Sequence, residues 1–215
     1  MVLKKKLWWV MTVLAILVAG YAIVQYYVIG PDKAALVNGK LEEQALNWIW
    51  YGMLYFHVAG SVVALVLGPF NLRRSLRERR PQLHRLMGRC YVVGVVVGGS
   101  TGVYLAFQAT GGLVSTLGFL SLAIGWLGSV YLAVKTIRAK RADLHRRWMI
   151  RNYALTLAAV MLRLWLGIFI FAFGGENFVA SYTIIAWLCW VPNVIVAEWY
   201  LRRRRSVSME NRVEA

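Results

Sequence analysis

Residues 7–29 read LWWVMTVLAILVAGYAIVQYYVI, a run of 23 residues with no charged side chain. A helix needs about 20 predominantly apolar residues to cross the hydrocarbon core of a bilayer. Further runs of this kind follow along the chain, at residues 48–70, 87–109, 113–134, 148–173 and 182–201. The sequence therefore predicts an all-α fold, an integral membrane bundle of six transmembrane helices.

The overall composition favours the same class of protein. Of the 215 residues, 60% are hydrophobic and 16% are charged, whereas a soluble domain has about 25% charged residues. This excludes ordinary soluble enzymes, disordered regulators and disulfide-stapled modules. Cys90 and Cys189 lie inside apolar runs, so we expect neither a disulfide framework nor a zinc motif. The tryptophans near the ends of the runs, Trp48 and Trp50 among them, are typical of aromatic belts at membrane interfaces.

The net charge of +16 is distributed unevenly along the chain. Of the 25 Lys and Arg residues, 22 lie at residues 4–6, 73–89 and 135–151 and from 202 onward, in alternate loops and at both ends. Lys33 and Lys40 lie in the other loops, and Arg163 lies within a run. Because basic loops stay in the cytoplasm, both termini are predicted to be cytoplasmic. The lipid bilayer and its anionic headgroups on that side are the expected partners, and no recognition module points to nucleic acid.

The chain divides into three parts on this basis. Residues 1–30 hold the first transmembrane helix with its basic N-terminus. This run is longer than the apolar core of a secretory signal, about 7–15 residues, so we expect it to be retained. Residues 48–201 form a five-helix membrane core, and residues 202–215 a basic cytoplasmic tail.

Two ionisable side chains, His57 and Arg163, fall within the predicted spans. Each lies about nine or ten residues from the outer end of its span, which places both roughly 13–15 Å below the outer surface. An arginine does not deprotonate in proteins, so Arg163 needs a hydrogen-bond acceptor, a water-filled cavity or an anionic ligand. We predict that His57 and Arg163 belong to one ligand-binding site. The alternative is that Arg163 bonds only to helix carbonyls and holds the bundle together.

Three more polar residues are candidates for binding a ligand: Asn193, Glu198 and Arg151. Asn193 follows Pro192, which we expect to interrupt the sixth helix and free carbonyl groups for binding. Glu198 is the only acid within a span, and it is placed to pair with Arg151 or Arg89 near the cytoplasmic end. These residues can bind a ligand, or they can simply link helices through hydrogen bonds and ion pairs.

His84 and His145 stand at equal depth at the cytoplasmic starts of two parallel helices. A bis-histidine haem needs two axial ligands at one level on facing helices, so these two are candidate haem ligands. The alternative is that both are ordinary interfacial histidines. No metal beyond haem iron is predicted, because a zinc site would need a third ligand at the same place. No phosphate-binding loop, nucleophile elbow or carboxylate pair assigns a reaction.

Several motifs resemble a known family. They are His57-Val-Ala-Gly60, Gly68-Pro-Phe-Asn71, the segments from Leu83 to Tyr91 and from His145 to Thr156, Leu162-Arg-Leu164, and the segment from Ala186 to Asn193. Together they resemble the bacterial membrane-protein family known as domain of unknown function 2306, from about Trp48 to the end of the sixth span. The family usually has glutamine where this chain has Asn71. The resemblance implies a six-helix protein of the bacterial cytoplasmic membrane, and it implies no reaction.

The sequence leaves two functional classes open. One is a redox subunit that binds haem b at His84 and His145 or a quinone near His57 and Arg163. The other is a protein that binds or transports a small anion or lipid at the buried Arg163 and His57. An accessory subunit of a larger membrane complex is a further possibility.

Overall fold

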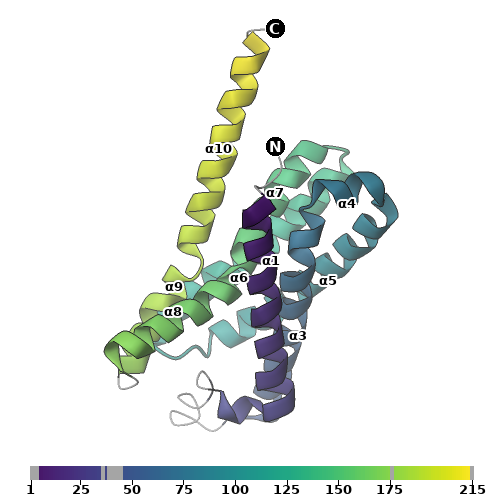
Figure 1. Ribbon diagram of the computed structural model, residues 1–215. Helices are drawn as coiled ribbons and strands as arrows, with labels where there is room; N and C mark the ends of the chain where they lie inside the picture. Colours follow the sequence, from purple (N-terminus) through teal and green to yellow (C-terminus); the bar gives the residue numbers. More distant parts are fainter. Residues whose placement is uncertain (1–4, 35–36, 38–45, 175–176, 214–215) are drawn as a thin grey trace.

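The computed structural model describes residues 5–34, 37, 46–174 and 177–213. Every regular element in these ranges is helical (Figure 1). The elements are α1 (Lys5–Ile23), the π-helix η1 (Val24–Ile29), the 3-10 helix η2 (Pro31–Lys33), α3 (Trp48–Asn71), α4 (Arg74–Arg79), α5 (Pro81–Ala106), α6 (Gly112–Arg138), α7 (Ala142–Thr156), α8 (Ala158–Phe173), α9 (Phe178–Leu188) and α10 (Val191–Val213).

Among the described residues, six helical segments are long and apolar enough to cross a membrane: Lys5–Ile29, Trp48–Asn71, Pro81–Ala106, Gly112–Arg138, Ala142–Phe173 and Phe178–Arg204. The predicted all-α, six-span architecture is confirmed. Lys4 and Lys40, which entered the charge pattern, lie outside the described residues.

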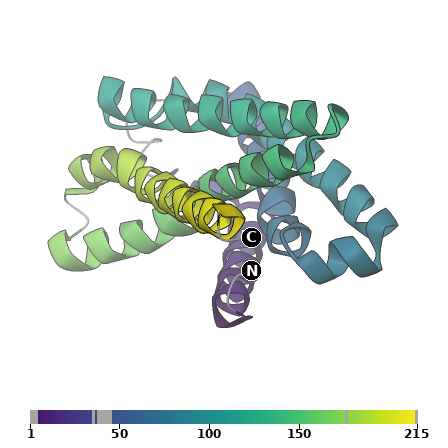
Figure 2. The same cartoon turned by 90° about the horizontal axis from the view of Figure 1, so that it is seen from above.

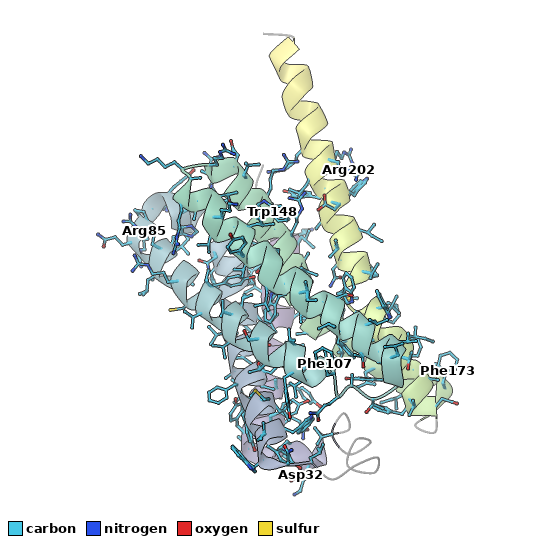
Figure 3. All side chains as sticks on the ribbon, turned by 180° about the vertical axis from the view of Figure 1, so that it is seen from behind. Asp32, Arg85, Phe107, Trp148, Phe173 and Arg202 are labelled. Carbon is cyan, nitrogen blue, oxygen red and sulfur yellow. The ribbon has the colours of Figure 1, made fainter. Side chains whose placement is uncertain are left out.

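The start of α1, the end of α10 and the α4 hairpin lie at one end of the molecule (Figure 1). We call this the basic end. Arg85 and Arg202 lie toward it, whereas Asp32 and Phe173 lie toward the opposite end (Figure 3). The described parts of the basic segments therefore lie together at the basic end of the bundle. The last helix also continues without a break from the sixth span into the segment expected to be a tail.

Helices α3 and α5 make an extensive and close contact, and glycines make it possible. A Cβ added to Gly60 would lie 2.6 Å from the carbonyl oxygen of Gly94 and 2.6 Å from the amide nitrogen of Gly98. No larger residue fits at such distances, so the two backbones touch directly. This contact determines the position of the residues one turn before Gly60 on α3.

Two spans are interrupted inside the bundle. The fifth changes from α7 to α8 at Leu157, and the sixth changes from α9 to α10 at Cys189 and Trp190. Pro192 follows the second interruption closely and explains it, because proline lacks an N–H group and clashes with the preceding turn. In Figure 1, α8 and α9 lie together and lean away from α1 and α3. Seen from above, α6 follows one side of the bundle and α1 lies on the other (Figure 2).

Candidate functional site

His57 lies on α3 at the glycine contact with α5. Its Nδ1 is 2.7 Å from the carbonyl oxygen of Gly98. A carbonyl only accepts hydrogen bonds, so Nδ1 carries the proton of the neutral imidazole and Nε2 is left as an acceptor. A Cβ on Gly102 would lie 3.1 Å from the ring, so this glycine gives the imidazole its space.

Arg163 comes from α8, just beyond the interruption at Leu157. One terminal guanidinium nitrogen, Nη1, donates to the carbonyl oxygen of Ala159 at 2.8 Å. Its Nε is buried and has no hydrogen-bond partner among the described residues. The guanidinium carbon lies 5.8 Å from the centre of the Tyr21 ring on α1. The backbone therefore satisfies only part of the donor capacity of this arginine.

His57 and Arg163 line the same cavity, which has a volume of about 240 Å³. The walls come from α1, α3, α5, α6, α7, α8 and α9, and most of the lining is apolar or aromatic. The residues beside both helix interruptions, Thr156 and Cys189 among them, belong to this lining. Irregular backbone inside a membrane protein is tolerated where it borders such a cavity.

The cavity also contains a buried donor that the sequence interpretation missed. Trp50 was assigned to an aromatic belt, yet only 5% of it is exposed and it lines the cavity. Its indole Nε1 is buried without a hydrogen-bond partner in the described part of the chain. Trp48, two residues earlier, is 83% exposed and fits the belt assignment. The sequence alone does not separate the two, because both stand in the first turn of one helix.

A buried polar network stands next to the cavity, between α5, α6 and α7. Tyr91 donates its hydroxyl hydrogen to Asn152 Oδ1 at 2.6 Å, and Asn152 Nδ2 donates to Ser129 Oγ at 2.8 Å and to the carbonyl oxygen of Trp126 at 2.7 Å. The Trp126 indole donates to Thr156 Oγ1 at 2.9 Å. Trp126 and Thr156 also line the cavity, so this network holds part of the wall in place.

This network was also missed at the sequence level. Its central residue, Asn152, is fully buried. A lone amide near the start of the apolar run at residues 148–173, next to the basic residue Arg151, was the available signal. The partners of its amide come from two other helices, α5 and α6, so their identity required the fold.

Arg151 and Glu198 meet near the basic end. Arg151 Nε donates to Glu198 Oε1, and Nη2 donates to Oε2 at 2.9 Å. The guanidinium also lies 4.7 Å from the centre of the Trp148 ring. Of the two partners proposed from the sequence, Arg151 is the one the structure places against Glu198. Neither side chain lines the cavity of His57 and Arg163.

Asn193 stabilises the interruption in the sixth span. Its Nδ2 donates to the carbonyl oxygen of Cys189 at 3.0 Å, and the Trp190 indole donates to that of Ala186 at 3.1 Å. These side chains occupy two of the carbonyl groups around the break. Cys189 lines the cavity and Asn193 does not.

The candidate haem ligands lie at the basic end, away from the cavity. His145 Nδ1 donates to the carbonyl oxygen of Ala133 on α6, 2.8 Å away. His84 Nδ1 is buried without a partner among the described residues. Neither histidine lines the cavity of His57 and Arg163.

The fold defines a polytopic membrane protein, and residues of several of its spans line one cavity. A family model described as predicted membrane protein (DUF2306) matches residues 54–201, and the chain belongs to this family. The match includes His57 and Arg163 but not α1, which supplies one wall of the cavity. Comparison with curated proteins gave no match, and comparison with solved structures gave none either.

Proposed function

We propose that this protein binds the head group of a quinone in the cavity of His57 and Arg163. The observation that carries the proposal is that two cavity-lining residues, Arg163 and Trp50, each have a buried donor, Nε and Nε1 respectively, without a hydrogen-bond partner among the described residues. A buried donor without a partner costs about 1–3 kcal/mol, which a ligand oxygen would recover. A quinone ring carries two such oxygens on opposite sides.

The lining favours this chemistry over a small inorganic anion. Four aromatic residues from three helices, Tyr26 of η1, Phe119 and Trp126 of α6 and Tyr182 of α9, line the cavity together with the polar groups. An inorganic anion would exchange its hydration for a mostly apolar wall, at a high desolvation cost. A neutral ring with polar edges buries its faces against the aromatic side chains instead. The volume of about 240 Å³ suits a single head group.

His57 would allow the cavity to bind the reduced form of the ligand, the quinol, as well. With Nδ1 bound to Gly98, its Nε2 accepts hydrogen bonds. A quinol hydroxyl donates one, whereas a quinone carbonyl does not. The cavity therefore holds donors for the oxidised head group and an acceptor for the reduced one, which is compatible with a redox role.

The orientation of the protein is part of the proposal. The basic segments gather at one end of the bundle, and the positive-inside rule places that end in the cytoplasm of a bacterial inner membrane. The cavity then lies in the outer half of the membrane. Anionic headgroups of the cytoplasmic leaflet would surround the basic end.

Equilibrium binding of a radiolabelled short-chain ubiquinone to the purified protein tests the proposal. Replacing Arg163 with glutamine is expected to weaken binding about 10-fold or more, because hydrogen bonds to charged groups contribute about 1.5–3 kcal/mol. Trp50→Phe removes only the N–H group and should weaken binding about 2- to 10-fold.

Trp165→Phe is the matched control. Trp165 also has a buried indole nitrogen without a partner in the described chain, but it does not line the cavity, so affinity should not change. Absence of quinone binding by the unmodified protein would overturn the proposal. So would binding that R163Q leaves intact. Displacement of the quinone by oleate, with oleate bound more tightly, would favour a lipid-binding protein instead.

A haem at His84 and His145 is a second candidate, supported by one observation. The bond from His145 Nδ1 to the carbonyl oxygen of Ala133 leaves Nε2 free, as in most metal-binding histidines, whose second nitrogen donates to a carbonyl or carboxylate. A visible spectrum of protein from haem-replete cells, oxidised and then reduced with dithionite, tests it. Sharp reduced α and β bands that disappear in H84A or H145A would support the haem. A colourless protein would exclude it.

A further inference from the structure

A second hollow, separate from the cavity of His57 and Arg163, lies at the basic end. It has a volume of about 310 Å³ and is open to the outside, with walls from the end of α3, from α4 and from the start of α5. Its polar wall consists of Arg73, Arg79, Arg80 and Ser75, and its apolar wall includes Leu83 and Met87. We call this hollow the arginine groove.

The positive charge of the arginine groove is not neutralised within the described residues. The nearby acid, Glu78, is bound by Arg74, whose Nε lies 2.6 Å from Glu78 Oε1, and neither residue lines the groove. Arg73, Arg79 and Arg80 form no ion pair with any acid in the described chain. Three arginines that line one hollow carry like charges, and an anion bound there would reduce the repulsion between them.

One of the three arginines is held in a defined position. The Arg73 guanidinium lies 4.5 Å from the centre of the Trp8 ring, and the Trp8 indole donates to the carbonyl oxygen of Pro69 at 2.8 Å. A guanidinium stacked on a ring keeps its edge free for hydrogen bonds. Planar guanidinium groups match the oxygens of a phosphate, often with two bonds each.

The apolar wall favours the phosphate of a lipid over a free phosphate ion as the ligand of the groove. Leu83 and Met87 lie one turn apart on α5, so they share a face of that helix. Leu86 and Val93 on the same helix are 57% and 61% exposed, so α5 carries further exposed apolar side chains beyond the groove. A free phosphate makes no use of such a surface. Acyl chains attached to the phosphate would cover it.

We propose that the arginine groove binds the phosphate of an anionic membrane phospholipid, with the acyl chains lying along α5. The proposal depends neither on the quinone nor on which leaflet the basic end faces. Basic pockets beside transmembrane helices are a general form of lipid recognition. The site needs a lipid whose charge is not cancelled by a cationic headgroup, so phosphatidylglycerol is preferred over phosphatidylcholine.

Native mass spectrometry of the purified protein tests this preference. The probes are dioleoyl phosphatidylglycerol and dioleoyl phosphatidylcholine, which have the same acyl chains. The unmodified protein is expected to retain phosphatidylglycerol at least 10-fold more tightly. The double variant R79Q/R80Q should lose most of this difference. R138Q/R141Q is the control, because it removes the same charge from the basic end but outside the groove; its preference should persist.

Two results would overturn the proposal. One is equal retention of the two lipids by the unmodified protein, and the other is an equal loss in R79Q/R80Q and in R138Q/R141Q. Inorganic phosphate that displaces the lipid at the lipid's own concentration would show a site for free anions instead. The single variants R79Q and R80Q keep the test valid if the double variant unfolds. Quinone binding by R79Q/R80Q should match that of the unmodified protein, so this test is independent of the cavity.

Discussion

His57 on α3 donates from Nδ1 to the carbonyl oxygen of Gly98 on α5, 2.7 Å away, at the glycine contact between these two spans. The bond determines which imidazole nitrogen accepts, and the contact determines where the ring lies. The proposed chemistry of the cavity thus depends on the glycines of this contact as well as on its polar side chains.

The first prediction concerns this imidazole. Replacing His57 with phenylalanine removes the Nε2 acceptor but keeps a ring of similar size. We expect affinity for the quinol to fall about 3- to 10-fold, because one neutral hydrogen bond contributes about 0.5–1.5 kcal/mol, while affinity for the quinone changes less. Parallel titrations with the oxidised and reduced forms of one short-chain ubiquinone measure the difference. An equal loss for both forms would contradict the assigned tautomer.

The second prediction concerns the glycine contact. A Cβ at Gly60 would lie 2.6 Å from backbone atoms of α5, so Gly60→Ala should force α3 and α5 apart and cost about 1–3 kcal/mol of the free energy of unfolding. Gly88→Ala is the control, because a Cβ there meets nothing within 4 Å. It should leave stability unchanged or raise it slightly, since alanine favours helix. Thermal unfolding in detergent compares the two, and equal melting temperatures would contradict the close contact.

The sequence predicted those features of the fold that depend on local composition, and it did not predict those that depend on packing between helices. Apolar runs and basic loops predicted the spans, because length and charge are local properties. Pro192 likewise predicted an interruption in the sixth span. The interruption at Leu157 has no proline or glycine beside it, so it depends on how α7 and α8 pack against other helices. The π-helix Val24–Ile29 is equally invisible in the local pattern.

The site was predictable to a similar extent. Polar residues stand out in apolar spans, so His57 and Arg163 were identifiable, and both line the cavity. Trp50 was not, because an indole at the start of a span is usually interfacial. Its burial results from its neighbours in the fold. Asn193 was predicted as a ligand-binding candidate because it is polar and lies in an apolar span. In the structure its side chain instead donates to the carbonyl oxygen of Cys189 at the helix interruption, and it does not line the cavity.

The third prediction compares two buried asparagines. The amide of Asn152 bonds to partners on two helices, so N152L should leave them unsatisfied and cost about 1–3 kcal/mol. Asn71 is 6% exposed, and neither its Oδ1 nor its Nδ2 has a partner in the described chain. N71L should therefore be neutral or stabilising. Unfolding by sodium dodecyl sulfate gives both values. A larger loss in N71L than in N152L would be inconsistent with these bonding patterns.

The fourth prediction concerns Arg151 and Glu198. Their side chains are 23% and 32% exposed, so the pair is partly screened by solvent. A double-mutant cycle of R151Q, E198Q and the combination should give a coupling energy of about 1 kcal/mol. Quinone affinity should stay the same in all three variants, because neither residue lines the cavity. Strict additivity of the stability changes would argue against the ion pair.

The most direct test of the central claim is to locate the bound quinone. A photoreactive short-chain quinone is irradiated with the purified protein, and the labelled peptides are identified by mass spectrometry. The label should lie on the cavity-lining segments of α3 and α8, around His57 and Arg163, and excess unlabelled quinone should abolish it. Label confined to other surfaces, or label that excess quinone does not displace, would contradict the claim that this cavity is a quinone site.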